Sequence, residues 1–249
     1  MNECVIVLGP YRSGTSLTAQ LLERLGVDFG PRAERIATNA FNPGGYLERG
    51  DLNAINRGLI TSAGRSLGAP GNPESLTRLA DRSILDGVSL PWPEHGPLWG
   101  LKDPRFCATL KIWIDTGALR SDLVRIVRLL RDPAAIVRSS LEHPSVRKFC
   151  GDDPEVARRM VQDYIALADW QIQTLGVPAF LLTYEDLLRN PPRETARIAD
   201  WLGIPDRQRI ASAARLVGKQ SARRRYYLHR SLTLPFRAVR KAYRMASGR

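Results

Sequence analysis

The stretch that decides the fold is Val5-Ile6-Val7-Leu8-Gly9-Pro10-Tyr11-Arg12-Ser13-Gly14-Thr15-Ser16. Its first four residues predict a short buried strand, and an apolar periodicity over residues 17–25 predicts a helix directly after the stretch. The loop between them has the glycine spacing G-x-x-x-x-G of a phosphate-binding loop. In such a loop the backbone N–H groups and the helix N-terminus hold an anion. We therefore expect a phosphate site at the end of the first strand.

The loop departs from that of the nucleotide triphosphatases at one position. Thr15-Ser16 stand where those proteins have Lys-Ser or Lys-Thr, so the lysine that reaches the β- and γ-phosphates is missing. A different basic residue, Arg12, lies inside the loop. The loop is thus expected to hold a phosphate but not to transfer the terminal phosphate of ATP.

The rest of the chain indicates an α/β protein. Apolar runs predict further strands at 98–101, 123–130 and 179–183. Helical patterns follow at 51–65, 74–86, 133–141, 154–176, 195–202 and 207–217. Because strands alternate with helices, we expect a single P-loop-like domain with a central parallel β-sheet flanked by helices.

The charge of the chain is concentrated at one end. Of its 249 residues with a net charge of +12, residues 207–249 carry thirteen basic side chains and no acidic one. The preceding 206 residues hold 24 basic and 25 acidic side chains and are close to neutral. A basic tail on a neutral domain favours an anionic ligand or a membrane surface over nucleic acid. We predict a domain at 1–218 and a basic helical segment at 219–249, whose amphipathic pattern suits peripheral contact with an anionic membrane.

Several classes of protein are disfavoured. Three cysteines and three scattered histidines show no metal-ligand spacing, so no metal is expected. No stacking platform or helix-turn-helix pattern indicates nucleic acid. No apolar run reaches the length of a transmembrane helix, and the first strand starts too early to leave room for a signal peptide. We expect a cytoplasmic protein, with the inner face of the membrane as a second location for the tail.

Five segments in chain order carry a family resemblance. They are Pro10-Tyr11-Arg12-Ser13-Gly14-Thr15-Ser16, Asn42-Pro43-Gly44-Gly45-Tyr46-Leu47-Glu48, Trp99-Gly100-Leu101-Lys102-Asp103-Pro104-Arg105, Arg131-Asp132-Pro133 with Ser139, and Tyr184-Glu185-Asp186-Leu187. Each resembles a motif of the sulfotransferases that use 3′-phosphoadenosine-5′-phosphosulfate (PAPS), above all the bacterial and Golgi-type members. Each motif is weak alone, but together they span most of residues 5–187.

The resemblance implies which residues bind the donor PAPS. Those implied for the 5′-phosphosulfate are Arg12, Ser13, Gly14, Thr15 and Ser16. Those implied for the 3′-phosphate and the nucleotide are Arg131, Ser139 and Tyr184. Many members close the 3′-phosphate site with a late basic loop, for which Lys219 and Arg223-Arg224-Arg225 are candidates. The product would be 3′,5′-adenosine bisphosphate (PAP), and no metal is required.

The resemblance also implies the catalytic residues. Glu48 would be the general base for an acceptor hydroxyl, and Lys102 and Arg12 would stabilise charge on the transferring group. The position of the catalytic histidine in cytosolic members holds Pro104 here, so a histidine base is not expected. The acceptor would be a carbohydrate, a lipid-linked glycan or a secondary metabolite, and the bacterial and Golgi-type likeness favours carbohydrate or lipid over simple phenols.

Other interpretations stay open at this point. Glu48 also fits an ordinary surface glutamate before a helix, and Lys102 a strand-end lysine that pairs with Asp103. The chain as a whole could be a diverged P-loop kinase or nucleotide triphosphatase, or a nucleotide-binding protein without catalysis. Magnesium-dependent turnover of ATP would favour the kinase.

Overall fold

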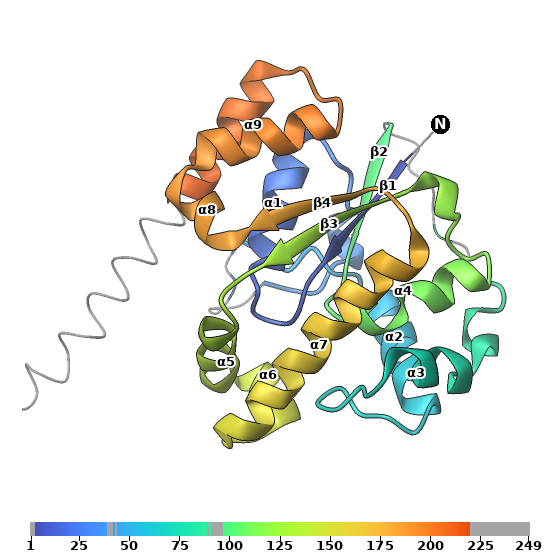
Figure 1. The fold of residues 1–249 in the computed structure, drawn as a ribbon. Helices are drawn as coiled ribbons and strands as arrows, with labels where there is room; N and C mark the ends of the chain where they lie inside the picture. The colour runs from blue at the N-terminus through green and yellow to red at the C-terminus, as the bar shows by residue number, and fades with distance from the viewer. Residues whose placement is uncertain (1–2, 39–41, 43, 89, 91–96, 220–249) are drawn as a thin grey trace, which may run out of the picture.

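The computed structural model describes residues 3–38, 42, 44–88, 90 and 97–219, and in these residues the strands form one parallel sheet in the order β2-β1-β3-β4 (Figure 1). The strands are β1 (Glu3–Leu8), β2 (Leu98–Lys102), β3 (Val124–Leu130) and β4 (Ala179–Thr183). In register, Cys4 lies between Trp99 of β2 and Val124 of β3. The predicted α/β class and parallel sheet are confirmed, and every predicted strand lies within two residues of its observed bounds.

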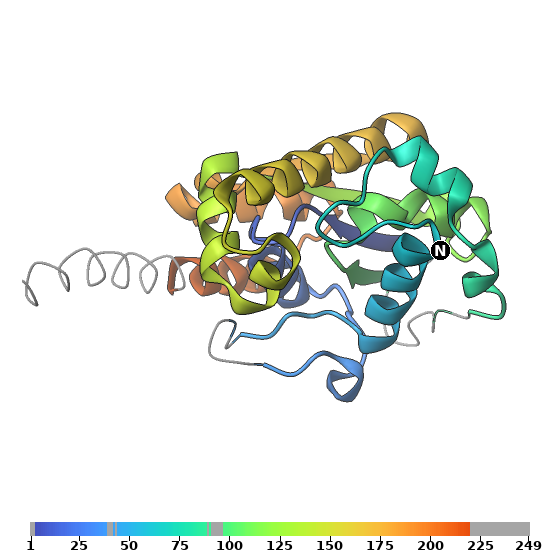
Figure 2. The ribbon, with the colours of Figure 1, turned by 90° about the horizontal axis from the view of Figure 1, so that it is seen from below.

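Helices cover both faces of this sheet (Figures 1 and 2). They are α1 (Thr15–Leu25), α2 (Gly50–Ser62), α3 (Pro73–Leu79), α4 (Phe106–Asp115), α5 (Pro133–Glu142), α6 (Pro144–Cys150), α7 (Pro154–Leu175), α8 (Tyr184–Arg189), α9 (Pro191–Trp201) and a last helix at 207–219. Helices α1, α8, α9 and the last one pack on one face, while α2, α4 and α7 pack on the other. None of these helices is both long and apolar enough to cross a bilayer.

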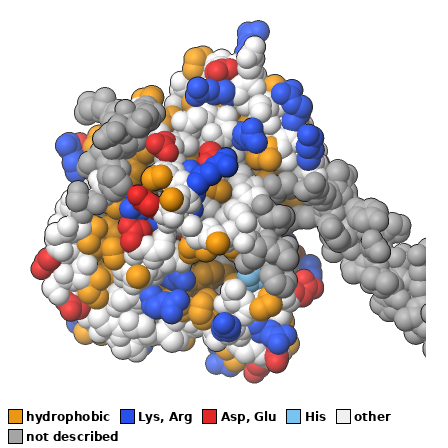
Figure 3. All heavy atoms as spheres, turned by 180° about the vertical axis from the view of Figure 1, so that it is seen from behind, with side chains coloured by type: hydrophobic (Ala, Val, Ile, Leu, Met, Phe, Trp, Pro, Cys, Tyr) orange, Lys and Arg blue, Asp and Glu red, His pale blue; other side chains and the backbone are white. Residues whose placement is uncertain are grey.

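Charged side chains of both signs are interspersed on the face shown in Figure 3, as expected for a domain of nearly zero net charge. Among the described residues, Arg105 and Arg128 are buried instead. Arg128 of β3 is buried and donates from Nε and Nη2 to Asp169 Oδ1 of α7, at 3.0 and 2.8 Å. A buried charge is tolerated when it is paired and hydrogen-bonded, and this contact explains how an arginine fits into a core strand.

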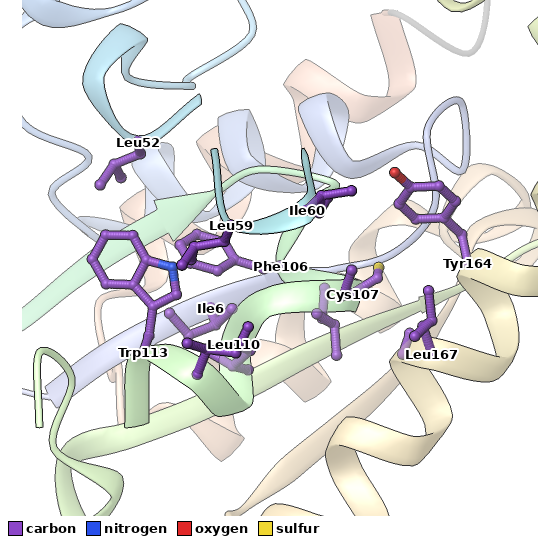
Figure 4. Close-up of a cluster of buried hydrophobic side chains, with 14 of the residues drawn as sticks. Ile6, Leu52, Leu59, Ile60, Phe106, Cys107, Leu110, Trp113, Tyr164 and Leu167 are labelled. Carbon is purple, nitrogen blue, oxygen red and sulfur yellow. The ribbon is translucent and has the colours of Figure 1, made fainter. Parts of the chain in front are cut away.

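The core follows from the alternation of side chains along the strands. Cys4, Ile6 and Leu8 of β1 point into the cluster under α2, α4 and α7, whereas Val5 and Val7 point into the cluster under α1 and α9. Figure 4 shows the first cluster, in which side chains of α2, α4 and α7 meet over the sheet. Because helices cover both faces of the sheet, a ligand can reach it only at an edge, and parallel sheets bind ligands at the carboxyl edge.

Four helical segments differ from the sequence-based expectation. The helix predicted at 74–86 is split, because α3 ends at Leu79 and a 3₁₀ turn occupies Arg82–Leu85. The break falls at Asp81, whose carboxylate accepts from the N–H of Ser83 at 3.0 Å and starts a new turn. Helices α4, α6 and α8 lie where no element is predicted. Helix α4 is buried on most sides, so it lacks the one-sided periodicity that reveals a surface helix.

Candidate functional site

The motifs singled out in the sequence meet at the carboxyl edge of the sheet. The loop at 9–14 follows β1, Asp103 follows β2, Arg131 follows β3 and Tyr184 follows β4. Because all four strands are parallel, their carboxyl ends lie at the same edge. Open parallel sheets bind ligands at this edge, next to the central strands.

The phosphate loop has the shape that its sequence predicts. Gly14 adopts φ 106° at the N-cap of α1, where no side chain caps the helix, so the helix N-terminus is open to an anion. Arg12 is also left-handed, with φ 66°, a conformation that non-glycine residues rarely adopt. Ser13 is buried and donates from both its hydroxyl and its N–H to the carbonyl of Pro10, at 2.7 and 3.2 Å. Ser13 therefore supports the loop from within.

The two predicted phosphate motifs touch each other. Arg12 Nε donates to the hydroxyl of Ser139 in α5 at 3.0 Å, and Arg131 Nη1 donates to the backbone carbonyl of Arg12. The Arg131 guanidinium lies over the ring of Tyr184, 4.6 Å from its centroid. A Cβ atom at Gly14 would lie 2.6 Å from Tyr184 Cε2, so the ring closes this side of the loop. Residues that follow β1, β3 and β4 thus form one cluster with Ser139 of α5.

This cluster carries two positive charges, on which Glu142, Glu185 and Asp132 act only from beyond ion-pair distance. Neither Arg12 nor Arg131 forms an ion pair within the described part of the chain. Burial lowers the pKa of both guanidinium groups. Arg131 Nε is buried and has no hydrogen-bond partner in the described structure. Two desolvated arginines beside an open helix N-terminus fit a ligand with negatively charged oxygens.

A second cluster lies on the opposite side of the loop. Lys102 at the end of β2 forms an ion pair with Glu48 Oε1 and donates to the hydroxyl of Ser16 at 3.2 Å. The two side chains of the ion pair are only 2% and 10% exposed. Glu48 is therefore not the surface glutamate of the alternative interpretation, and Lys102 does not pair with Asp103. Asp103 pairs with Arg105 instead, at 2.9 Å.

A network behind Glu48 was not predicted from the sequence. Asn53 Nδ2 donates to Glu48 Oε2 at 3.3 Å and to Asp103 Oδ2 at 2.9 Å. Asn56, one turn further along α2, donates to the same Asp103 oxygen at 3.0 Å. The side-chain oxygen Oδ1 of Asn56 accepts from the side chains of Thr109 and Trp113 in α4, at 2.7 and 2.8 Å. The sequence pattern that could have indicated this network is the pair of asparagines three residues apart, which lie close together on one side of a helix.

The buried ion pair of the second cluster and Arg12 of the first cluster line one cavity of about 250 Å³. Its walls include Arg12, Gly14, Thr15 and Ser16 of the loop and both members of the buried ion pair, and α6 contributes further walls. Figure 3 shows a hollow with hydrophobic side chains around it on this face, next to the histidine drawn in pale blue.

His143 lines this cavity, although the sequence places it outside every motif. Burial, with a smaller effect of the Arg12 charge, lowers its pKa to about 4, so the imidazole is neutral near pH 7. The described residues contain no group of three His, Cys, Asp or Glu side chains arranged to bind a metal. The tail at 220–249 lies outside the described residues, so the candidate basic loop at 223–225 cannot be placed.

Comparisons with known proteins identify the family of the chain and bear on its fold. The family model described as "Sulfotransferase domain" matches residues 2–234. The solved sulfotransferase STF1 from Mycobacterium tuberculosis H37Rv is 16% identical, the match covers 86% of this chain and 71% of that one, and the TM-score is 0.50. The sulfotransferase domain from the curacin biosynthetic pathway is 15% identical over 84% of this chain and 77% of that one, with a TM-score of 0.49. A search of curated proteins gives no match. The likeness to STF1 supports the fold.

Proposed function

The chain belongs to the sulfotransferase domain family, and from that premise we propose that it transfers a sulfuryl group from PAPS to the hydroxyl group of an acceptor. The observation that carries the proposal is the position of two clusters on either side of one phosphate loop. Desolvated Arg12 and Arg131 lie on one side, and the buried pair of Glu48 and Lys102 lies on the other. The first suits a phosphorylated nucleotide, and the second suits proton transfer from an acceptor.

The donor would be held mainly by the loop and by the arginines. Gly14, Thr15 and Ser16 would offer backbone N–H groups and hydroxyls to the 5′-phosphosulfate. Arg131, whose guanidinium has a donor to spare, would bind the 3′-phosphate with Ser139. Tyr184 would fix Arg131 through their stacking contact.

The reaction needs a base and a place for negative charge. In the proposed step, the acceptor oxygen forms a bond to sulfur while its proton passes to the Glu48 carboxylate. The bond from sulfur to the bridging oxygen breaks, and its electron pair leaves on the phosphate of PAP. Lys102 lies between Ser16 of the loop and Glu48, so its charge serves both the leaving phosphate and the base. Arg12 would add positive charge from inside the loop. The bonds, the proton and the electron pair of this step are all accounted for without a metal ion.

Calorimetric titration tests the donor site. In EDTA, we expect PAP to bind at least roughly tenfold more tightly than AMP, because a charge-assisted contact to the 3′-phosphate contributes about 1.5–3 kcal/mol. Arg131→Ala should reduce this preference, whereas Arg138→Ala, an exposed neighbour on α5, should keep it. Equal binding of PAP and AMP to the unaltered protein would contradict the donor assignment. Magnesium-dependent ATP turnover, measured in parallel samples that contain magnesium in place of EDTA, would favour a kinase.

The network behind Glu48 gives a second prediction. Asn53→Ala removes the N–H that holds Glu48 Oε2, so we expect kcat to fall about tenfold while the Kd of PAP stays unchanged. Asn56→Ala is the matched control, because it also breaks a buried contact to Asp103 but does not touch Glu48. Both variants should have a lower Tm. Only Asn53→Ala should have a lower kcat when both are measured below the temperature at which they unfold. Equal kcat in the two variants would mean that Asn53 is merely structural.

The remaining predictions from the sequence are proposals of the same kind. We retain a catalytic domain at 1–218 and a separate basic segment at 219–249, although the family match continues to residue 234. Contact of that segment with an anionic membrane would be measured by vesicle binding of the full chain and of a chain that ends at residue 231.

A further inference from the structure

Six of the side chains that line the cavity are apolar or aromatic. They come from the phosphate loop, α1, the segment between α1 and α2, and α6, and they are Tyr11, Leu17, Ile36, Tyr46, Val146 and Phe149. The Arg105 guanidinium lies 5.6 Å from the ring centroid of Tyr11, and Lys102 Nζ lies 5.9 Å from that of Tyr46. None of the six is needed to hold the phosphates of the proposed donor. They line the same cavity as Glu48, the proposed base, and are therefore where the acceptor would lie.

The aromatic wall is held in place from behind. The ring of Tyr11 lies 5.6 Å from that of Phe149 and packs edge-on at 5.2 Å against Tyr164 of α7. The Tyr164 hydroxyl donates to the carbonyl of Leu67 at 3.1 Å. A Cβ atom at Gly68 would overlap the carbonyl oxygen of Phe149, so this loop packs directly on α6. The wall is thus a fixed surface on which a flat apolar group can pack.

Several polar side chains of the cavity already have partners in the protein, although Arg105 Nε and the Tyr11 hydroxyl form no hydrogen bond among the described residues. Asn53 donates to Glu48 and Asp103, and Asn42 donates to the carbonyl of Gly45 at 2.8 Å. Arg105 is paired with Asp103. A sugar would bury several hydroxyl groups here, and each one left without a partner costs about 1–3 kcal/mol.

The volume of the cavity and the charges that line it further restrict the class of acceptor. The volume of about 250 Å³ is shared with the sulfuryl end of the donor, and it lies below the roughly 300 Å³ at which pockets for drug-sized ligands begin. Arg12 and Lys102 face the cavity with Glu48 as the one carboxylate among its described lining residues. This sign of charge disfavours an amine or another cationic acceptor.

We propose that the acceptor is a compact, largely apolar phenol or alcohol of one or two rings, whose ring packs on Tyr11 and Phe149 and whose hydroxyl faces Glu48. This inference rests on the proposed sulfotransferase function. It selects a small hydroxylated metabolite in place of the carbohydrate or lipid that the family likeness favours.

The test measures binding rather than turnover. With the protein saturated with PAP, calorimetry is done with 2-naphthol and with methyl β-glucopyranoside. We expect 2-naphthol to bind at least about tenfold more tightly, and Phe149→Ala to weaken it about tenfold with no change in the Kd of PAP. Val156→Ala, at an exposed apolar site on α7, should change neither value.

The outcomes separate the two proposals. Tighter binding of the glucoside, or a 2-naphthol affinity that Phe149→Ala does not alter, would overturn the acceptor class while PAP binding stays intact. Failure of PAP to bind the unaltered protein would instead contradict the sulfotransferase proposal. If Phe149→Ala does not fold, Phe149→Leu gives the same comparison, because it keeps apolar volume but removes the ring.

Discussion

Glu48→Gln is expected to reduce kcat by about 10²–10⁴-fold, the usual contribution of a positioned general base, with the Kd of PAP nearly unchanged. The amide keeps the size of the side chain and one acceptor oxygen, so its NH2 group faces either Lys102 or Asn53, and it cannot accept a proton from the acceptor. Steady-state kinetics together with PAP calorimetry check both halves of the prediction. Retained turnover would remove Glu48 from the mechanism.

The same substitution also leaves the Lys102 ammonium buried without its counter-charge. Breaking a buried ion pair typically costs about 3–5 kcal/mol, so a loss of activity must be separated from a loss of folding. Glu194→Gln provides the matched control. The side chain of Glu194 is also buried, at 3% exposure against 10% for Glu48, and pairs with Arg197 on α9, away from the cavity. We expect both variants to melt at lower temperature and only Glu48→Gln to lose turnover. Glu48→Asp should retain more turnover than the amide, because it keeps the carboxylate.

Gly14→Ala is expected to weaken PAP binding by about a hundredfold, which corresponds to roughly 2.7 kcal/mol. A left-handed residue with a Cβ costs about 1–2 kcal/mol by itself. At Gly14 the added atom also meets the ring of Tyr184, which must move away. Since Arg131 stacks on that ring, the displacement would spread from the 5′-phosphate loop to the residue proposed for the 3′-phosphate.

Gly176→Ala is the control that measures the backbone cost without a steric clash. The difference between the two variants is then the effect of the clash. Gly176 has φ 62° at the end of α7, and no described atom lies within 4 Å of a Cβ placed there. It should lose stability to the backbone alone and bind PAP normally. Tyr184→Ala removes a buried ring and lowers Tm by itself, but it should lower Tm less in the Gly14→Ala background than in the unaltered protein, because it also removes the clash. If Gly14→Ala and Gly176→Ala bind PAP equally well, the ring contact is unimportant.

The fold was largely predictable because its strands are short apolar runs between turn residues. The strand at 179–183 was located to the residue, and α7 within one residue at its end. Helix α4 was missed since Phe106, Leu110 and Trp113 are buried together with most of their neighbours, which hides its periodicity. The helix predicted at 74–86 was too long, because a single aspartate side chain restarts the turn.

The site residues that belong to sequence motifs could be predicted, and the others could not. The motifs named Glu48, Lys102, Arg12 and Arg131, but no pattern along the chain shows that Lys102 pairs with Glu48, 54 residues earlier. Asn53 and His143 gain their place only through tertiary packing of α2 and α6 at the cavity. Residue roles at 48, 102, 131 and 139 stay predictions until the variants are measured.

The strand order β2-β1-β3-β4 also determines when the site can form. The phosphate loop follows the first strand made, yet its neighbours belong to strands that begin at residues 98 and 124, and Tyr184 follows the last strand. Pairings so distant in sequence close late and slowly during folding. The nascent chain therefore contains the loop long before it contains a nucleotide site. A nucleotide that binds only the finished sheet would stabilise it by about 2.7 kcal/mol at a hundred times its Kd. The donor would thereby protect the chain from proteolysis, and the cellular half-life of this protein would follow the supply of its own co-substrate.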